Sequence, residues 1–167
     1  SFYDKVSING KTHRANGEVA WLLGPAAIRA EYNQSRQSRD GLGTGGVNLP
    51  GVVAKGYTAQ ATYLLTGETK PEAGVVVPHS DLFIDGAGRN GWGAWEIKLR
   101  YDNLQIHDSA ATSNRADTFN FGINWYFNRY MKYMVDVGVE RFKDPLRSPK
   151  PGDSDFFVWM NRIVVVF

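Results

Sequence analysis

Strict alternation of apolar and polar residues over long segments is the feature that most constrains the fold of this chain. In residues 93–102, one row of alternate positions consists of Trp95, Ile97, Leu99 and Tyr101. The row between them consists of Glu96, Lys98, Arg100 and Asp102. Successive side chains of a β-strand point to opposite faces of its sheet, so this segment predicts a strand with one apolar and one charged face. Helical periodicity is hard to find in the chain.

The same alternation recurs along the chain and predicts an all-β, antiparallel fold. It is found in residues 18–23, 27–33, 57–66, 118–127, 131–140 and 155–167. Residues 1–8 are a candidate for one more strand, which brings the expected number to about eight.

The expected connections differ in character at the two ends of the sheet. Gly24-Pro25 and residues 128–130 predict tight turns at one end. The connections at the other end are longer and polar, and they are residues 38–51, 108–117 and 144–154. Residues 67–91 break this rule, because they are long although they belong at the tight-turn end.

Length and composition exclude several classes of protein. A chain of 167 residues with 43% hydrophobic residues can form one domain and is too short for two ordinary ones. An aromatic content of 13% excludes intrinsic disorder, and no apolar run is long enough for a transmembrane helix. The absence of cysteine excludes disulfides, zinc–thiolate sites and thiol nucleophiles. A net charge of +2 gives no indication of nucleic-acid binding.

The length of the apolar rows and the position of the aromatic residues favour a membrane-spanning sheet. The rows run for about ten residues, close to the 9–11 of a transmembrane strand and longer than the five or six of an average soluble strand. Aromatic residues gather near the predicted strand ends, as Trp92, Trp95, Trp125 and Phe127 illustrate. Two aromatic girdles around an aliphatic belt are typical of outer-membrane β-barrels. We therefore expect the apolar rows to face lipid and the charged rows to face the interior.

The charged rows contain the candidate functional residues. The candidates for pore-lining and anion-binding cations are Arg29, Lys98, Arg100, Lys132 and Arg162. A dry core would exclude such a set, because a buried charge costs several kcal/mol, whereas a water-filled lumen accommodates it. Arginine and lysine would offer successive sites to a permeating anion. Acidic residues share the same faces, among them Glu96 and Asp102, so a neutral, internally paired pore wall is the alternative interpretation.

Other motifs do not indicate catalysis or a cofactor. The triplet His79-Ser80-Asp81 holds the residue types of a hydrolase triad, but a triad assembles residues from separate elements. Residues 41–46 and 86–91 match a glycine-rich dinucleotide motif without the helix that such a site requires. The three histidines, His13, His79 and His107, are far apart in sequence, so we expect no metal, no cofactor and no enzymatic activity.

Several runs of residues resemble a known family, the phosphate-selective porins O and P. The runs are GYTAQATYLLTGE at residues 56–68, GWGAWE at 91–96 with Arg100-Tyr101 after it, GINWY at 122–126, and EVAW at 18–21 with Gly24-Pro25 and Glu31-Tyr32. They occur in the order that the family shows and cover most of residues 18–167. The terminal Phe167 is similar to the C-terminal aromatic residue of outer-membrane barrels.

The resemblance implies a fold and a function for the chain. Family members are barrels of about 16 strands, and residues 1–167 resemble the C-terminal portion of that single barrel domain. The resemblance also implies the bacterial outer membrane as location, contact with membrane lipid, a homotrimer, and recognition of Phe167 by the outer-membrane assembly machinery. The implied function is passive diffusion of small solutes, above all anions such as phosphate.

Two alternatives remain open at this point. A self-contained barrel of eight strands would have an interior filled by side chains and would serve a structural or adhesive role. A soluble ligand-binding β-barrel would bury the aromatic rows as its core. The chain begins at Ser1 without a leader, which fits either a removed signal peptide or a piece of a longer chain.

Overall fold

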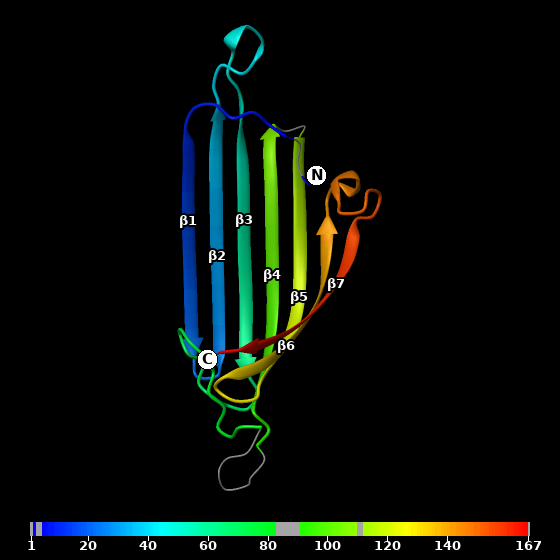
Figure 1. The fold of residues 1–167 in the computed structure, drawn as a ribbon. Coiled ribbons are helices and arrows are strands. Elements are labelled where there is room, and N and C mark those ends of the chain that lie inside the picture. The colour runs from blue at the N-terminus through cyan, green and yellow to red at the C-terminus, as the bar shows by residue number, and fades with distance from the viewer. Residues whose placement is uncertain (1, 3–4, 83–90, 110–111, 167) are drawn as a thin grey trace.

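The chain folds into one antiparallel sheet of long strands (Figure 1). The computed structural model describes residues 2, 5–82, 91–109 and 112–166. The strands are β1 (Thr12–Leu23), β2 (Ala26–Arg39), β3 (Leu49–Leu64), β4 (Ala94–Ser109), β5 (Thr112–Tyr126), β6 (Met131–Phe142) and β7 (Asp155–Val165). Two short 3₁₀ turns, Thr44–Gly46 and Pro145–Arg147, lie in the connections. The prediction of an all-β antiparallel fold is confirmed.

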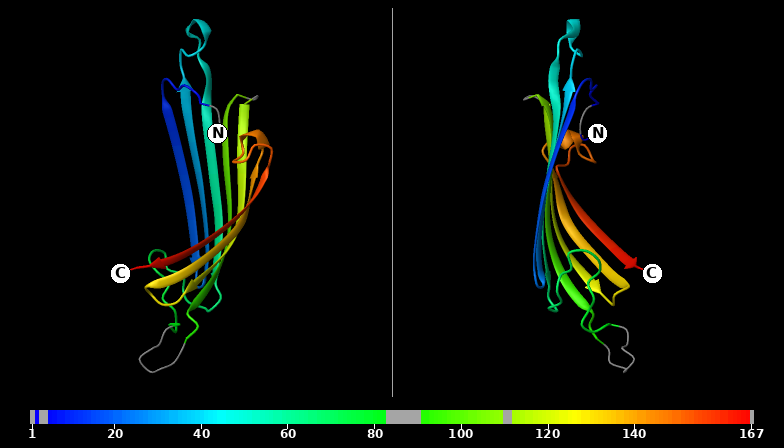
Figure 2. Two further views of the ribbon diagram at one scale, coloured as in Figure 1. Left: turned by 45° about the vertical axis from the view of Figure 1, so that its right-hand side comes forward. Right: turned by 90° about the vertical axis from the view of Figure 1, so that its left-hand side faces the viewer.

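Each strand pairs only with its neighbours in sequence. The order across the sheet is β1-β2-β3-β4-β5-β6-β7, and all six pairings are antiparallel. The sheet twists strongly, so that β6 and β7 run obliquely to β1–β5 (Figure 2). Among the described residues, no pairing joins β1 to β7, and the sheet is therefore open at both edges.

The expectation of an eighth strand in residues 1–8 is wrong for the residues that the structure describes. Residue 2 and residues 5–8 lie outside any strand, and Asn9 forms an isolated bridge with Arg39 of β2. Gly10, with φ at 106°, turns the chain away from the free edge of β1. The segment instead crosses the ends of the strands to reach β5 (Figure 1), where the Asn114 side chain donates a hydrogen bond to the Phe2 carbonyl at 2.7 Å.

Strands β1 to β6 are longer than the alternation predicted, because backbone pairing continues beyond the apolar rows, whereas β7 ends at Val165, short of the predicted 155–167. The predicted long connection at residues 108–117 is wrong: β4 continues to Ser109 and β5 begins at Thr112. The polar segment Thr112–Asp117 pairs with β4 although it lacks an apolar row. The connection between β3 and β4 is long and lies at the same end as the tight turns after β1 and β5, as expected.

The register divides the sheet into an apolar face and a polar face. On the apolar face, Leu99 lies between Ala61 and Phe121, and side chains such as Phe157 remain as much as 73% exposed. On the polar face, Arg100 lies between Gln60 and Asn120. The small buried apolar cluster consists of Leu64, Val76, Ala94 and Tyr126. A sheet whose apolar face is uncovered has the side-chain distribution of a strand layer that meets lipid.

No helix in the described part of the chain is both long and apolar enough to cross a membrane.

Candidate functional site on the polar face

The first part of the β3–β4 connection, residues 65–82, folds against the sheet at its tight-turn end. We call this segment the covering loop. Backbone hydrogen bonds join Leu65 to the Trp95 carbonyl at 2.7 Å, Lys70 to the Gly24 carbonyl at 2.7 Å and Leu82 to the Phe127 carbonyl at 2.8 Å. Val76 adds its side chain to the buried apolar cluster. The loop is therefore tied to both tight turns and to β4.

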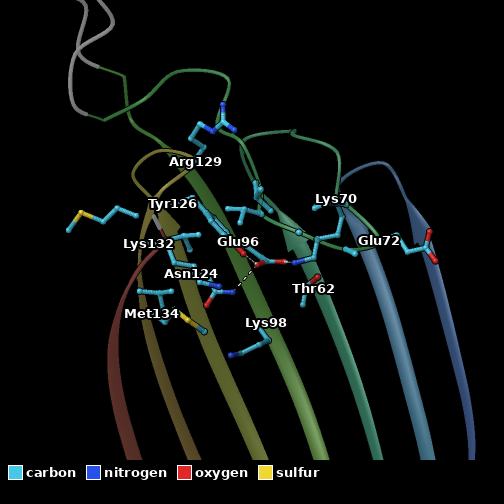
Figure 3. A pocket seen from close by; sticks show the side chains of 18 of the residues that line it. Thr62, Lys70, Glu72, Glu96, Lys98, Asn124, Tyr126, Arg129, Lys132 and Met134 are labelled. Atoms are coloured by element: carbon cyan, nitrogen blue, oxygen red, sulfur yellow. Dashed lines mark hydrogen bonds and ion pairs between the residues drawn. The ribbon is translucent and has the colours of Figure 1, made fainter.

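A buried carboxylate joins the covering loop to the wall of the sheet. The Glu96 side chain is fully buried and forms an ion pair with the Lys70 ammonium group (Figure 3). Glu96 also accepts hydrogen bonds from Asn124 Nδ2 at 2.8 Å and from the Tyr126 hydroxyl at 2.7 Å. These three donors satisfy a charge that would be costly to bury alone. The ion pair with Glu96 thus fixes the position of Lys70 over the polar face.

A second carboxylate stabilises the covering loop internally. The Glu68 side chain is 4% exposed and accepts hydrogen bonds from the Thr66 hydroxyl and, at 3.1 Å, from the His79 backbone N–H. Burial alone would raise the pKa of Glu68, but these hydrogen bonds and the nearby His79 imidazole hold the pKa below its usual value. The ionised form of Glu68 is therefore the one that holds the loop together.

A cavity of about 720 Å³ lies between the covering loop and the polar face (Figure 3). Three of the predicted cations line it, namely Arg29 from β2, Lys98 from β4 and Lys132 from β6. Arg129, in the tight turn after β5, and Lys70 also line it, and the sequence pattern did not single out either of them. Both lie outside the alternating rows, so periodicity could not have found them.

The remaining predicted cations lie on the same face but outside this cavity. Arg100 and Arg29 line an adjoining hollow of about 610 Å³ together with Glu18 and Glu31. Arg162 lies opposite Met134 in the register of β6 and β7, with its guanidinium 3.8 Å from the Met160 sulfur. The structure thus brings Arg29, Lys98 and Lys132 together around one cavity, places Arg100 beside it, and leaves Arg162 on β7.

The predicted cations differ in how far acidic side chains neutralise them. The Lys98 ammonium lies 2.6 Å from Asp136, and the Arg100 guanidinium makes two hydrogen bonds of 2.7 Å with Asp102. Arg29 donates to the Glu72 backbone carbonyl at 2.8 Å, and the Lys132 ammonium lies 5.5 Å from the centre of the Tyr126 ring. Within the described part of the chain, Arg29 and Lys132 have no carboxylate partner, and they present positive charge to the cavity.

The Lys98–Asp136 pair depends on the glycine between its partners. Lys98, Gly122 and Asp136 lie side by side on β4, β5 and β6. A Cβ at position 122 would collide with the Asp136 carboxylate and lie 2.8 Å from Lys98 Cε. The missing side chain allows the two charged groups to meet across the strand that separates them.

Two polar atoms beside the cavity have no partner of their own. Thr62 Oγ1 and Asn124 Oδ1 are buried and lack a hydrogen-bond partner among the described residues. Both residues line the cavity. Buried polar groups are almost always satisfied, so these two atoms are exceptions in the wall of the cavity. In the described ranges, no group of three or more His, Asp or Glu side chains could hold a metal ion.

Comparisons with known proteins give the chain a family. A family profile described as "Phosphate-selective porin O and P" matches residues 3–152. The chain is similar to Porin O of Pseudomonas aeruginosa, with 30% identity over 166 residues that cover 90% of this chain and 34% of that protein. The chain thus spans about a third of the length of the curated relative that it matches. The match covers most of the chain, and the chain therefore belongs to the phosphate-selective porin O and P family.

Proposed function

We propose that the chain forms part of a porin barrel through which small solutes, above all anions such as phosphate, diffuse passively. Membership of a porin family implies the bacterial outer membrane as the location of the chain and agrees with the prediction that it is not an enzyme. The single observation that carries the proposal is the division of the sheet. Its apolar face is uncovered, and its polar face bears cations around a cavity of about 720 Å³.

The proposal assigns the polar face to a water-filled interior. Arg29 and Lys132 would contact the permeating anion, because no carboxylate neutralises either of them in the described part of the chain. Arg162 would contribute to the potential along the wall, whereas ion pairs with Asp136 and Asp102 neutralise much of the charge of Lys98 and Arg100. Several weak sites of this kind allow an anion to enter and to leave.

The proposal extends to the whole protein. Residues 1–167 would be the C-terminal portion of a single barrel domain of about 16 strands. The open edges at β1 and β7 fit a role as one arc of such a barrel. A homotrimer is proposed on the family resemblance, as is a role for Phe167, which lies outside the described residues, in recognition by the assembly machinery.

Neither alternative interpretation has a specific observation in its favour. A self-contained eight-stranded barrel requires pairing between the first and last strands, which the described residues do not make. A soluble barrel requires a buried apolar face, whereas Phe119 and Trp159 are 60% and 67% exposed.

Ion selectivity in planar bilayers tests the proposed function. Replacing Arg29 and Lys132 with Gln is expected to lower the anion-to-cation permeability ratio, by about fivefold if one contact worth ~1 kcal/mol is lost. The fall should be clearest at low salt, where screening is weakest. The variant Lys98→Gln/Asp136→Asn removes a neutral pair and should change the ratio little.

The matched control removes two positive charges far from the cavity. Lys5→Gln/Lys150→Gln changes the total charge as much as Arg29→Gln/Lys132→Gln does, and both of its residues are exposed and outside the strands. The proposal requires the control to keep the wild-type ratio. An unchanged permeability ratio in the Arg29/Lys132 variant would show that these two residues line the wall without setting the ion selectivity.

A further inference from the structure

The apolar face ends at an aromatic row on the side of the β2–β3 and β6–β7 connections. This row, the upper aromatic row, consists of Tyr32, Tyr57, Tyr101 and Phe119 on four adjacent strands. The Tyr57 and Tyr101 rings are 5.6 Å apart, and the Tyr101 and Phe119 rings are 4.5 Å apart. Trp95 and Trp125, whose rings are 4.6 Å apart, mark the other end of the face. Trp95 and Tyr101 are six residues apart on one strand, which is about 20 Å along it.

Beyond the upper aromatic row, the same face of the strands becomes cationic. Gln34, Lys55, Gln105 and Arg115 lie side by side across β2 to β5. Arg36 lies two residues beyond Gln34 on β2. Arg141 of β6 lies beside Asp117 of β5. We call Arg36, Lys55, Arg115 and Arg141 the outer basic band.

The outer basic band retains positive charge after its internal ion pairs are counted. Arg115 makes hydrogen bonds of 2.7 and 2.8 Å with Asp117, and Arg141 lies 2.6 Å from Asp155. Arg36 and Lys55 have no acidic partner in the part of the chain that the structure describes. Four cations thus face two carboxylates.

The tight-turn end of the same face has no such band. The outward positions at the ends of the described strands there are Leu23, Tyr63, Trp95, Trp125, Tyr133 and Val165, all of them uncharged. The two boundaries of the apolar face therefore differ in charge. A bilayer whose two leaflets carried the same headgroup charge would not account for this difference.

We propose that the outer basic band binds the phosphate groups of lipid headgroups in the leaflet on the side of the β2–β3 and β6–β7 connections. The guanidinium of Arg115 lies 3.4 Å from the Tyr101 hydroxyl, which places it directly beside the aromatic row. Aromatic girdles lie at headgroup level, and arginine matches phosphate through paired N–H donors. Lys55, at the same level of the sheet as Arg115, can extend its flexible side chain toward the same layer.

The proposal concerns the lipid side of the sheet and does not rest on the proposed anion pathway. The partner is a phosphorylated lipid, whose chains cover the apolar face while its headgroup meets the cations. Each cation near an anionic lipid surface contributes about 1 kcal/mol, which corresponds to about fivefold in affinity.

Native mass spectrometry of the full-length protein in detergent tests the proposal. The probe is a glycolipid with two phosphate groups, compared with the same glycolipid after phosphate removal. The wild-type protein should retain the phosphorylated form more tightly, and Arg36→Gln/Lys55→Gln should weaken that retention by more than tenfold, at about fivefold for each cation.

The control removes equal charge from the same end of the molecule without changing the outer basic band. Arg14 lies on β1 opposite Ser35, on the polar face, and Lys150 lies in the β6–β7 connection. Arg14→Gln/Lys150→Gln should leave lipid retention unchanged. Arg36→Lys, in contrast to Arg36→Gln, should keep most of the lipid retention, because it keeps the charge.

Two outcomes would overturn the proposal. Equal retention of the phosphorylated and dephosphorylated glycolipid by the wild-type protein would do so without any variant, even if the substituted proteins failed to fold. Equal weakening in the band variant and in the control would show a general effect of net charge instead of a site.

Discussion

At the scale of single residues, the interactions of the charged groups on the polar face depend on the side chains that lie beside them. Lys98 and Asp136 belong to strands that are not neighbours, and they meet because Gly122 between them has no side chain. Lys132 has no carboxylate partner in the described part of the chain and instead lies over the Tyr126 ring. The charge that a cation presents to solvent is therefore set by the residue next to it as much as by the cation.

Gly122→Ala is expected to separate Lys98 from Asp136. The new methyl group would occupy the space of both side chains, so we expect a loss of about 1–3 kcal/mol in stability, typical of overpacking. Chemical unfolding measures the effect. Gly17→Ala on β1 is the matched control, because a Cβ there meets nothing within 4 Å; equal destabilisation by both substitutions would contradict the steric argument.

The covering loop is expected to lose stability when Glu68 is protonated. The pKa of Glu68 is lowered in the folded loop, so its contribution is fully present above the pKa of an unfolded glutamate, about 4.3. It is lost as the pH falls through the lower folded value. Amide hydrogen-exchange protection of the His79 N–H, corrected for the intrinsic rate, should therefore decrease below about pH 4. In Glu68→Gln this pH dependence should be absent, and its persistence would place the titrating group elsewhere.

At the scale of elements, the covering loop is the segment whose position depends on a few contacts. Its ionic link to the sheet is the Lys70–Glu96 ion pair, supported by Asn124 and Tyr126. Lys70 is 17% exposed, and Glu96 is fully buried, so neither charge is well solvated without the other.

Glu96→Ala is expected to release the covering loop from the sheet. Removing one partner of a buried ion pair costs about 3–5 kcal/mol, because the remaining charge stays unpaired. Limited proteolysis should then cut within residues 65–82 at a higher rate, while the strands remain resistant. The double variant Lys70→Met/Glu96→Gln should recover part of the protection, since it leaves no buried charge. Equal cleavage in the single and double variants would contradict a role for the ion pair.

The sequence predicted the parts of strands in which one face is apolar. It missed the parts in which neither face is apolar. The predicted segment 93–102 lies within β4 from Ala94 onward, and 131–140 lies within β6, because their alternation is set by the two-sided environment of the sheet. The Thr112–Asp117 part of β5 has no such pattern, and only its pairing with β4 defines it. The site was predicted in part for the same reason: Arg29, Lys98 and Lys132 belong to alternating rows, whereas Lys70 and Arg129 reach the cavity from connections.

At the scale of the whole molecule, the two faces of the sheet are predicted to meet different solvents. Ile97 lies in the apolar row and Lys98 in the polar row of the same strand. The apolar face would contact lipid and the polar face water, as in outer-membrane barrels.

Spin labels at positions 97 and 98 are expected to report opposite environments. In reconstituted protein, the label at position 97 should be accessible to oxygen, which concentrates in lipid, and the label at position 98 to a water-soluble nickel reagent. Labels at Ala61 and Thr62 on β3 repeat the comparison one strand away, since Ala61 lies opposite Leu99 and Thr62 opposite Lys98. Equal water accessibility at both members of each pair would contradict the membrane-spanning interpretation.

The pairing of each strand with its sequence neighbours has a consequence for the order in which the molecule folds. Each pairing joins strands that follow one another in the chain, so the sheet can grow one strand at a time from any hairpin. The N-terminal crossing segment is different, because Phe2 meets Asn114 across 112 residues and its ring packs 6.2 Å from that of Phe142. That contact cannot form until β5 and β6 are in place, which makes the docking of the first residues of the chain a late step in folding.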